Sequence, residues 1–264
     1  MGKLSAIGRG FYGTGIAGIG FATIYYSDFP YMLIPSEHGW MPGLTILAYV
    51  FGALLILAGA CIVFKIRARL IALLLGSVLL LIFCLYFIPY QLIVSKNNMH
   101  FGDWENAAKE LALSGGAFVV AACFSEKNES IITRFLRKLI PSGAIVFAAT
   151  IISFGIDHFL YAKGAAEYIP SWIPNHIFWI YVGGVALLGS GIAIILKIKL
   201  QLVAALLGTM IFTWFIILHI PKAIAAPVED MGGEATSAFL ALAYSGIAFI
   251  ISGGAKSNTA MKMR

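Results

Sequence analysis

The most reactive combination of side chains in this sequence lies near its middle, in the stretch FGIDHFLYAKG at residues 154–164. Asp157 and His158 are adjacent there, and Tyr161 follows about one helical turn later. The residues between Pro141 and this pair are mostly apolar. An acid inside an apolar membrane helix is costly, so such residues usually pair with another group or carry a function.

Two further histidines lie at comparable positions in the next two apolar stretches. His176 precedes Trp179 by three residues, and His219 closes the stretch that follows. If these stretches are consecutive membrane helices, His158, His176 and His219 lie at one level, near one surface of the membrane. The helical spacing also places Trp179 on the same face as His176.

This set of residues is compatible with three kinds of site. A histidine beside an acid and a tyrosine can hydrogen-bond a quinone carbonyl and transfer protons, because histidine titrates near neutral pH. Histidines with a carboxylate can hold a transition metal, but no His-x-x-x-His spacing occurs, and we predict no metal ligands. The same residues can instead stabilise an interface with another subunit. The candidate cofactor-binding residues are His158, Asp157, Tyr161, His176, Trp179 and His219.

The composition places these residues in a membrane protein. Of the 264 residues, 60% are hydrophobic and only 11% are charged, whereas soluble domains carry about 25% charged residues. Apolar runs of about 20 residues span a bilayer as helices, and no short alternating pattern of a membrane barrel occurs. We predict an all-α membrane protein with eight spans at 9–27, 43–64, 70–92, 105–124, 141–161, 175–196, 200–221 and 233–253.

The positions of the basic residues predict the orientation. With the N-terminus in the cytoplasm, fourteen of the 18 Lys and Arg residues fall on the cytoplasmic side, as the positive-inside rule requires. The C-terminus is then also cytoplasmic. The net charge of +6 thus reflects topology, and we expect contact with the lipid bilayer and no nucleic-acid binding. Most acidic residues, Glu105, Glu110 and Glu234 among them, are expected to be solvated or to begin helices at the outer side.

The two halves of the chain align at an offset of 132 residues. Gly52 falls on Gly184, Gly76 falls on Gly208, and the basic turn KIRAR (65–69) falls on KIKLQ (197–201). Each half has four spans, so the copies share one orientation in the membrane. We predict two tandem four-helix bundles at 1–124 and 141–264, joined by a cytoplasmic linker at 125–140.

The alignment shows that the polar residues belong to one copy only. Upstream, a small gap brings Gly20 onto Gly155, and Asp157 and His158 then correspond to Ala22 and Thr23. At the offset of 132, His176 and His219 correspond to Leu44 and Phe87. The candidate site is therefore expected in the second repeat, on a scaffold that both repeats share.

The second repeat resembles the DoxX-like family of small four-helix membrane proteins. The resembling stretches, in order, are IDHFLY (156–161), IPSWIPNHIFWIYVGGVALLGSGIAI (169–194), LHIPK (218–222) and LALAYSG (240–246). The resemblance implies a four-helix bundle, here duplicated, and a link to quinone-coupled membrane redox complexes. His158, His176 and His219 are the positions that it singles out.

These observations lead to one expected function and two alternatives. We expect a membrane subunit of an oxidoreductase or respiratory assembly in the bacterial inner membrane, with partner membrane subunits and a quinone or proton site in the second repeat. The first alternative is a structural or assembly subunit without a cofactor, for which the glycine-rich spans provide packing surfaces. The second is a small-molecule transporter with its site between the two repeats.

Overall fold

A computed structural model describes residues 2–34, 44–96, 99–125, 130–225 and 233–262, and these residues contain helices and no strand. The predicted all-α architecture is therefore confirmed for the described part of the chain. The helices of the first half are α1 (Lys3–Tyr25), α2 (Leu44–Phe64), α3 (Ala68–Ile82) with two π-helical turns η1 (Phe83–Phe87) and η2 (Tyr90–Val94), and α4 (Phe101–Ala121).

The second half begins with a short connecting segment and then repeats this pattern. Residues 126–129 of the predicted linker lie outside the described residues, and the remainder forms α5 (Ile131–Leu136) and a 3-10 turn, η3 (Arg137–Ser142). The helices that follow are α6 (Gly143–Leu160), α7 (Ala162–Ala166), α8 (His176–Ile195), α9 (Leu200–Trp214) with the π-helical turn η4 (Phe215–His219), α10 (Ile220–Ala225) and α11 (Gly233–Lys262).

Six helical segments in the described residues are long and apolar enough to cross a membrane. They are 44–64, 68–94, 131–160, 176–195, 200–225 and 233–254, and they identify a multi-pass membrane protein. The expected spans at 9–27 and 105–124 are helical, but α1 and α4 are not among the six, because both carry charged residues and many small ones.

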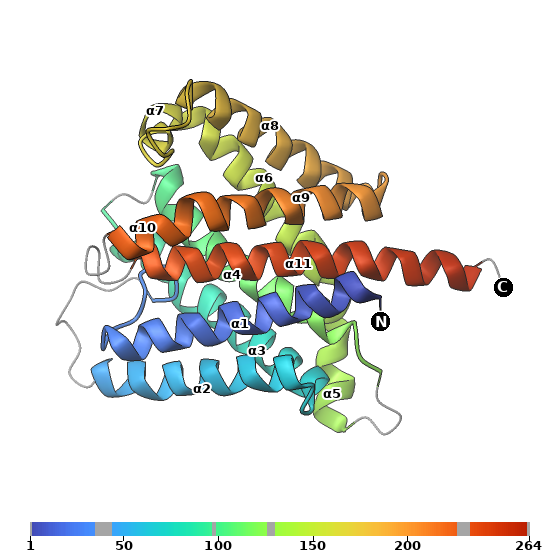
Figure 1. Cartoon of the computed structure of the whole chain (residues 1–264). Coiled ribbons are helices and arrows are strands. Elements are labelled where there is room, and N and C mark those ends of the chain that lie inside the picture. The colour runs from blue at the N-terminus through green and yellow to red at the C-terminus, as the bar shows by residue number, and fades with distance from the viewer. Residues whose placement is uncertain (1, 35–43, 97–98, 126–129, 226–232, 263–264) are drawn as a thin grey trace.

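The helices pack as neighbouring pairs that join the two halves. Helix α1 lies along α2 on one side and along α11 on the other, while α4 lies between α3 and α6 (Figure 1). Helices α4 and α11 also touch, and one continuous buried cluster contains residues of both halves. The N- and C-termini lie at the same end of the molecule (Figure 1), and we call the opposite end the distal end.

Glycines allow the closest approaches between these helices. A Cβ atom on Gly115 of α4 would lie 2.8 Å from the carbonyl oxygen of Gly143 on α6, and a Cβ on Gly143 would lie 2.6 Å from the carbonyl of Gly115. Gly8 of α1 and Gly246 of α11 meet in the same reciprocal way. Because no side chain separates the backbones, the main-chain atoms of the two helices are in van der Waals contact where they cross. Small residues allow such close packing of helices in membranes.

Several local features recur at the offset that aligns the two halves. Lys65 and Arg67 have positive φ angles of 63° and 44°, and Lys197 and Lys199, 132 positions later, have angles of 57° and 40°. The π-helical turns η1 and η4 are separated by the same offset. The two basic turns and the two irregular helix segments thus have matching backbone conformations.

A buried hydrogen bond also recurs. Ser114 Oγ on α4 donates to the carbonyl of Gly76 on α3 at 2.7 Å, and Ser245 Oγ on α11 donates to the carbonyl of Gly208 on α9 at 2.9 Å. In both cases the glycine faces the ring of a phenylalanine on the partner helix, Phe118 or Phe249. The serine therefore bonds a carbonyl that a glycine leaves accessible.

Removal of either serine hydroxyl should lower the free energy of unfolding by the same small amount. Ser114→Ala and Ser245→Ala each lose one buried hydrogen bond, which corresponds to about 1 kcal/mol of unfolding free energy. The control is Thr209→Ala, because Thr209 is exposed and bonds only the Ala205 carbonyl of its own helix. The measurement is the free energy of unfolding of all three variants in detergent. A large difference in this free energy between the two serine variants would show that the two contacts are not equivalent.

Candidate functional site

A pair of carboxyl groups links α4 and α6 at the distal end. The carboxyl groups of Glu105 and Asp157 lie close enough to interact, and both side chains are partly buried. Asp157 Oδ1 is buried without a hydrogen-bond partner among the described residues. An ionised carboxylate only accepts hydrogen bonds, so a hydrogen bond between the two groups requires a proton on one of them. Lys109, one turn after Glu105, is close enough for its charge to act on both carboxyl groups. The structure therefore places two interacting carboxyl groups between α4 and α6, beside the side chain of Lys109.

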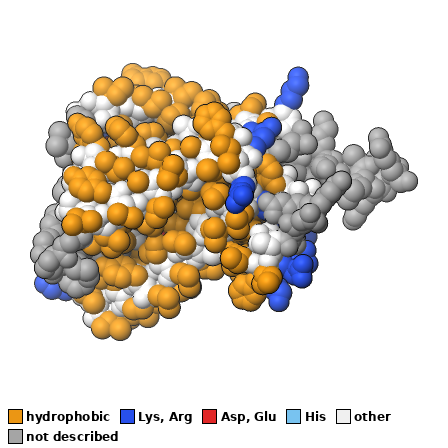
Figure 2. All heavy atoms as spheres, turned by 90° about the horizontal axis from the view of Figure 1, so that it is seen from below, with side chains coloured by type: hydrophobic (Ala, Val, Ile, Leu, Met, Phe, Trp, Pro, Cys, Tyr) orange, Lys and Arg blue, Asp and Glu red, His pale blue; other side chains and the backbone are white. Residues whose placement is uncertain are grey.

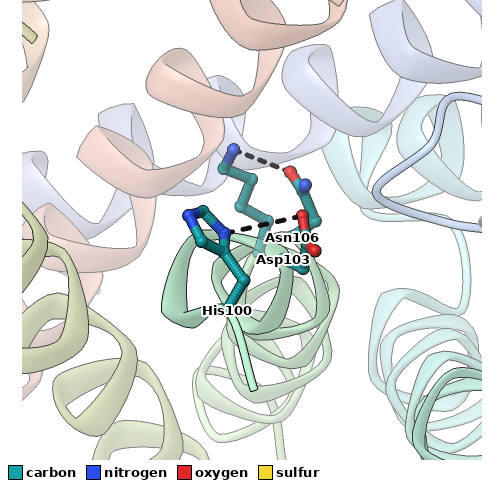
Figure 3. Close-up of polar contacts among 4 residues, drawn as sticks. His100, Asp103 and Asn106 are labelled. Atoms are coloured by element: carbon teal, nitrogen blue, oxygen red, sulfur yellow. Dashed lines mark hydrogen bonds and ion pairs between the residues drawn. The ribbon is translucent and has the colours of Figure 1, made fainter. Parts of the chain in front are cut away.

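The first turns of α4 carry further polar contacts next to this pair. Lys109 Nζ donates to Asn106 Oδ1 at 3.0 Å, and His100 Nδ1 lies 3.9 Å from Asp103 Oδ1 (Figure 3). The side chains of His100, Asp103 and Asn106 project from the start of one helix (Figure 3). Asp103 is in the first turn of α4, where an acid interacts favourably with the positive end of the helix dipole.

The adjacent residues Asp157 and His158 point toward different helices. Asp157 reaches Glu105 on α4, whereas His158 packs against Gly183 and Gly184 of α8. The Nδ1 atom of His158 lies 2.7 Å from the carbonyl oxygen of Phe154, one turn earlier in its own helix. A neutral His158 that donates through Nδ1 leaves Nε2 as an acceptor on the α8 side.

The other predicted site residues lie in separate contacts. The ring of Tyr161 packs on His100, with centroids 5.3 Å apart, and Trp179 makes an edge contact with Phe178 at 5.4 Å. His176 begins α8, and His219 ends η4, near enough to Lys109 and Lys222 for their charges to act on it. Among the described residues, no hydrogen bond or ring contact joins His176, Trp179 or His219 to Asp157 or His158.

A cavity of about 400 Å³ opens at the distal end. Its wall combines aromatic, apolar and polar side chains from the segments after α1 and α7 and from the starts of α4 and α11, including Phe29, Tyr31, Met32, Asn106, Lys109, Tyr168, Glu234 and Ser237. Lys109 belongs to both the cavity wall and the surroundings of the carboxyl pair. None of the six predicted site residues is among the described residues that line the cavity.

Two tyrosines on the cavity wall have distinct electrostatic environments. Burial, reinforced by Tyr90 and Asp103, raises the pKa of Tyr31 above its ordinary value, so its phenol stays neutral and can donate a hydrogen bond. Lys222 Nζ lies 3.3 Å from the centre of the Tyr168 ring, which is a cation–π contact. The wall therefore offers a neutral donor, flat rings and charges of both signs.

In the described part of the chain, no three His, Cys, Asp or Glu side chains form a group that could hold a metal ion. Asp157 Oδ1 is buried without a hydrogen-bond partner among the described residues, and His158 Nδ1 lies within hydrogen-bonding distance of a carbonyl of its own helix. The polar groups at the distal end are thus placed for hydrogen bonding.

Three residues of α4 have surroundings that the sequence pattern does not predict. Glu105 and Lys109 are expected on the solvated outer side, but they form the polar core of the distal end. Glu110 is expected to be solvated as well, and this expectation is wrong, because its side chain is 0% exposed. The i to i+4 spacing of Glu105 and Lys109 was the available signal, since it places opposite charges on one helix face.

No family model, curated protein or solved structure matches the chain. The resemblance to the DoxX-like family therefore stays a prediction that rests on the residues quoted for it.

Proposed function

We propose that this chain is an eight-span protein of the bacterial inner membrane, built from two tandem DoxX-like four-helix units of parallel orientation. The recurring turns, π-helical segments and serine–glycine contacts support the tandem arrangement. Most Lys and Arg side chains visible in Figure 2 gather at the end that holds both termini, and hydrophobic side chains cover the middle. This distribution supports cytoplasmic termini, because cytoplasmic loops are enriched in cations.

We infer that the distal end handles protons for a membrane redox or respiratory assembly. The observation that carries this function is the close interaction of the Glu105 and Asp157 carboxyl groups beside Lys109. A shared proton at a membrane surface can be passed to or from a reacting group with little rearrangement. A quinone-coupled partner needs such a group, since reduction and oxidation of a quinone carbonyl take up and release protons.

The structural alternative is favoured by the glycine-mediated helix crossings and by the exposed apolar faces of α2 and α8. A scaffold of this kind would bind partner subunits through its helices and would not use the carboxyl pair in a reaction. The two functions make opposite predictions for an isosteric change at Asp157.

The decisive experiment compares Asp157→Asn with the wild type in complexes purified from native membranes in mild detergent. The amide that this substitution introduces can donate a hydrogen bond to Glu105 without a shared proton, so assembly should be unchanged. Quinone-linked turnover of the co-purified partner should fall about 100-fold or more, the usual contribution of a positioned acid or base. Mass spectrometry of the same sample identifies partner proteins and bound quinones.

The matched control is Glu167→Gln, which removes an exposed acid at the same end of the molecule. Unchanged turnover in Asp157→Asn would refute the proton-handling function. A complex that contains neither a redox protein nor a quinone would support the scaffold instead.

A further inference from the structure

A second carboxyl group lies deeper in the molecule, on another face of α4. Glu110 is 0% exposed, and neither of its carboxyl oxygens has a hydrogen-bond partner among the described residues. Its neighbours along the helix, Ala107, Leu113 and Ser114, are also buried. This side chain differs from Glu105, which interacts with Asp157.

The hydroxyl groups near Glu110 are committed to main-chain carbonyls. Four of them, from four different helices, hold this part of α4 in place. They are Tyr12 of α1, which donates to the Leu113 carbonyl at 2.7 Å, Tyr244 of α11 to Lys109 at 2.8 Å, Thr150 of α6 to Ala108 at 3.2 Å, and Ser114 itself to Gly76 of α3 at 2.7 Å. With these donors used, the turn that carries Glu110 is fixed while its carboxyl group stays unbonded.

The second half of the chain shows that the scaffold does not need an acid at this position. Ser114 and Ser245 make the same hydrogen bond to corresponding glycines. In the last span of each half the alignment shifts by one residue, because Ser114 falls on Ser245 at an offset of 131, so the residue that corresponds to Glu110 is Ala241. An alanine thus satisfies the packing, and the carboxyl group of Glu110 has no structural role in the shared fold.

The cost of burial determines the state of this carboxyl group. An ionised carboxylate without a partner in an apolar interior is far more costly than the neutral acid, which loses only ordinary hydrogen bonds. Buried acids in membrane helices are retained mainly where protons or ions are handled. We propose that Glu110 is a proton-binding site in the membrane interior, separate from the carboxyl pair at the distal end and contributed by the first half of the chain.

The consequence is a restriction on proton release. Loss of the proton would leave a bare carboxylate among apolar groups, so Glu110 exchanges its proton only when a donor or water reaches it. The four hydrogen bonds that clamp α4 oppose such an opening. Exchange at Glu110 therefore depends on movement of α1, α3, α6 or α11 relative to α4.

A hydrophobic carbodiimide tests this site directly in native membranes of cells that express the full chain. Dicyclohexylcarbodiimide partitions into lipid and adds to a protonated carboxyl group. The acid O–H adds across one C=N bond, and the acyl group then migrates to nitrogen, so the whole reagent is retained as an N-acylurea. Peptide mass spectrometry should find this adduct on Glu110, and a water-soluble carbodiimide should not produce it.

Two variants and one salt condition make the result decisive. Glu110→Gln should lose the adduct completely, while Glu110→Asp, which keeps the acid, should retain it. Size-exclusion chromatography checks that both variants fold. Absence of the adduct on a recovered wild-type Glu110 peptide would overturn the proposal, and protection by sodium ions at constant pH would overturn it in favour of a metal cation.

The same labelling separates this site from the proposed function. Asp157→Asn should label at Glu110 to the same extent as the wild type, because the carboxyl pair lies between α4 and α6 on a different face. Loss of labelling in Asp157→Asn would show that the two sites are not separate and would refute the inference.

Discussion

Valine in place of Gly8 should prevent α1 from packing against α11. A Cβ atom at this position meets the Gly246 carbonyl oxygen, and it lies 2.9 Å from both the Ile250 nitrogen and the Phe249 Cβ. Two of these atoms belong to the backbone of α11, so no side-chain rotation relieves the overlap. Overpacking of this kind costs about 3 kcal/mol or more when the backbone itself must shift.

Gly10 provides a matched control on the same helix. A Cβ atom on Gly10 would meet nothing within 4 Å, although the residue lies only two positions from Gly8 and is also a helical glycine. Gly10→Val should therefore change stability by less than about 1 kcal/mol, within the range of helix propensity alone.

The measurement is the fraction of folded protein after heating in detergent, followed by size-exclusion chromatography. We expect Gly8→Val to lower the apparent melting temperature strongly and Gly10→Val to leave it nearly unchanged. Equal behaviour of the two variants would mean that the α1–α11 crossing is not as close as described. The same crossing joins the first and last helices, so its loss should also weaken the association of the two halves.

Replacement of Arg9 by methionine is expected to have the second large effect. Arg9 is 7% exposed, and its Nη1 atom lies 2.5 Å from the carbonyl oxygens of both Ile62 and Val63, at the end of α2. The last carbonyls of a helix lack intrahelical donors and carry the negative end of the dipole. The guanidinium group supplies hydrogen bonds to both carbonyls and the complementary charge, and among the described residues Ile62 otherwise accepts only a long bond of 3.4 Å from the Lys65 nitrogen.

The expected loss follows from the strength of charged hydrogen bonds. A hydrogen bond to a charged group contributes about 1.5–3 kcal/mol, so Arg9→Met should lower the unfolding free energy by about 3 kcal/mol. Methionine keeps the length of the apolar stem and removes only the polar head. Lys3→Met is the control, because Lys3 is an exposed cation on the same helix.

Chemical unfolding in detergent compares these two variants with the wild type. A loss of stability that is equal in Arg9→Met and Lys3→Met would indicate a general effect of net charge rather than helix capping. Trypsin cleavage near residues 65–69 is a second readout, since Lys65 and Arg67 are already exposed and an uncapped end of α2 should loosen and be cleaved faster.

Helix content and membrane insertion follow from the order of residues along the chain. Runs such as 43–64 and 70–92 contain few or no charges, and a buried backbone in lipid must satisfy its own hydrogen bonds, which leaves helices as the solution. The offset of 132 residues also predicts paired features, and the structure has matching turns at Lys65 and Lys197. The orientation of the chain in the membrane stays a prediction, and so do the two spans expected in addition to the six apolar segments.

The candidate site shows what the order of residues leaves open. Asp157 and His158 are adjacent in sequence, but successive residues project about 100° apart around a helix. One therefore reaches α4 and the other reaches α8, and the predicted cluster with His176, Trp179 and His219 is dispersed. The rotation of each helix depends on which faces its neighbours bury, and no residue pattern within one helix specifies that choice.

Three acids, the two of the carboxyl pair and the buried Glu110, show the same difference between what the sequence predicts and what the packing decides. Glu105, Glu110 and Asp157 are each visible in the sequence as acids within or beside apolar helices. Their partners are decided by tertiary packing: α6 brings Asp157 to Glu105, whereas the helices that enclose α4 shield Glu110 from water and leave it without a partner among the described residues. Sequence alone determined that this protein consists of apolar helices in a bilayer, because hydropathy is a property of each segment. Only the tertiary structure decided which acids interact with each other and which is isolated, because that depends on distances between helices far apart in the chain.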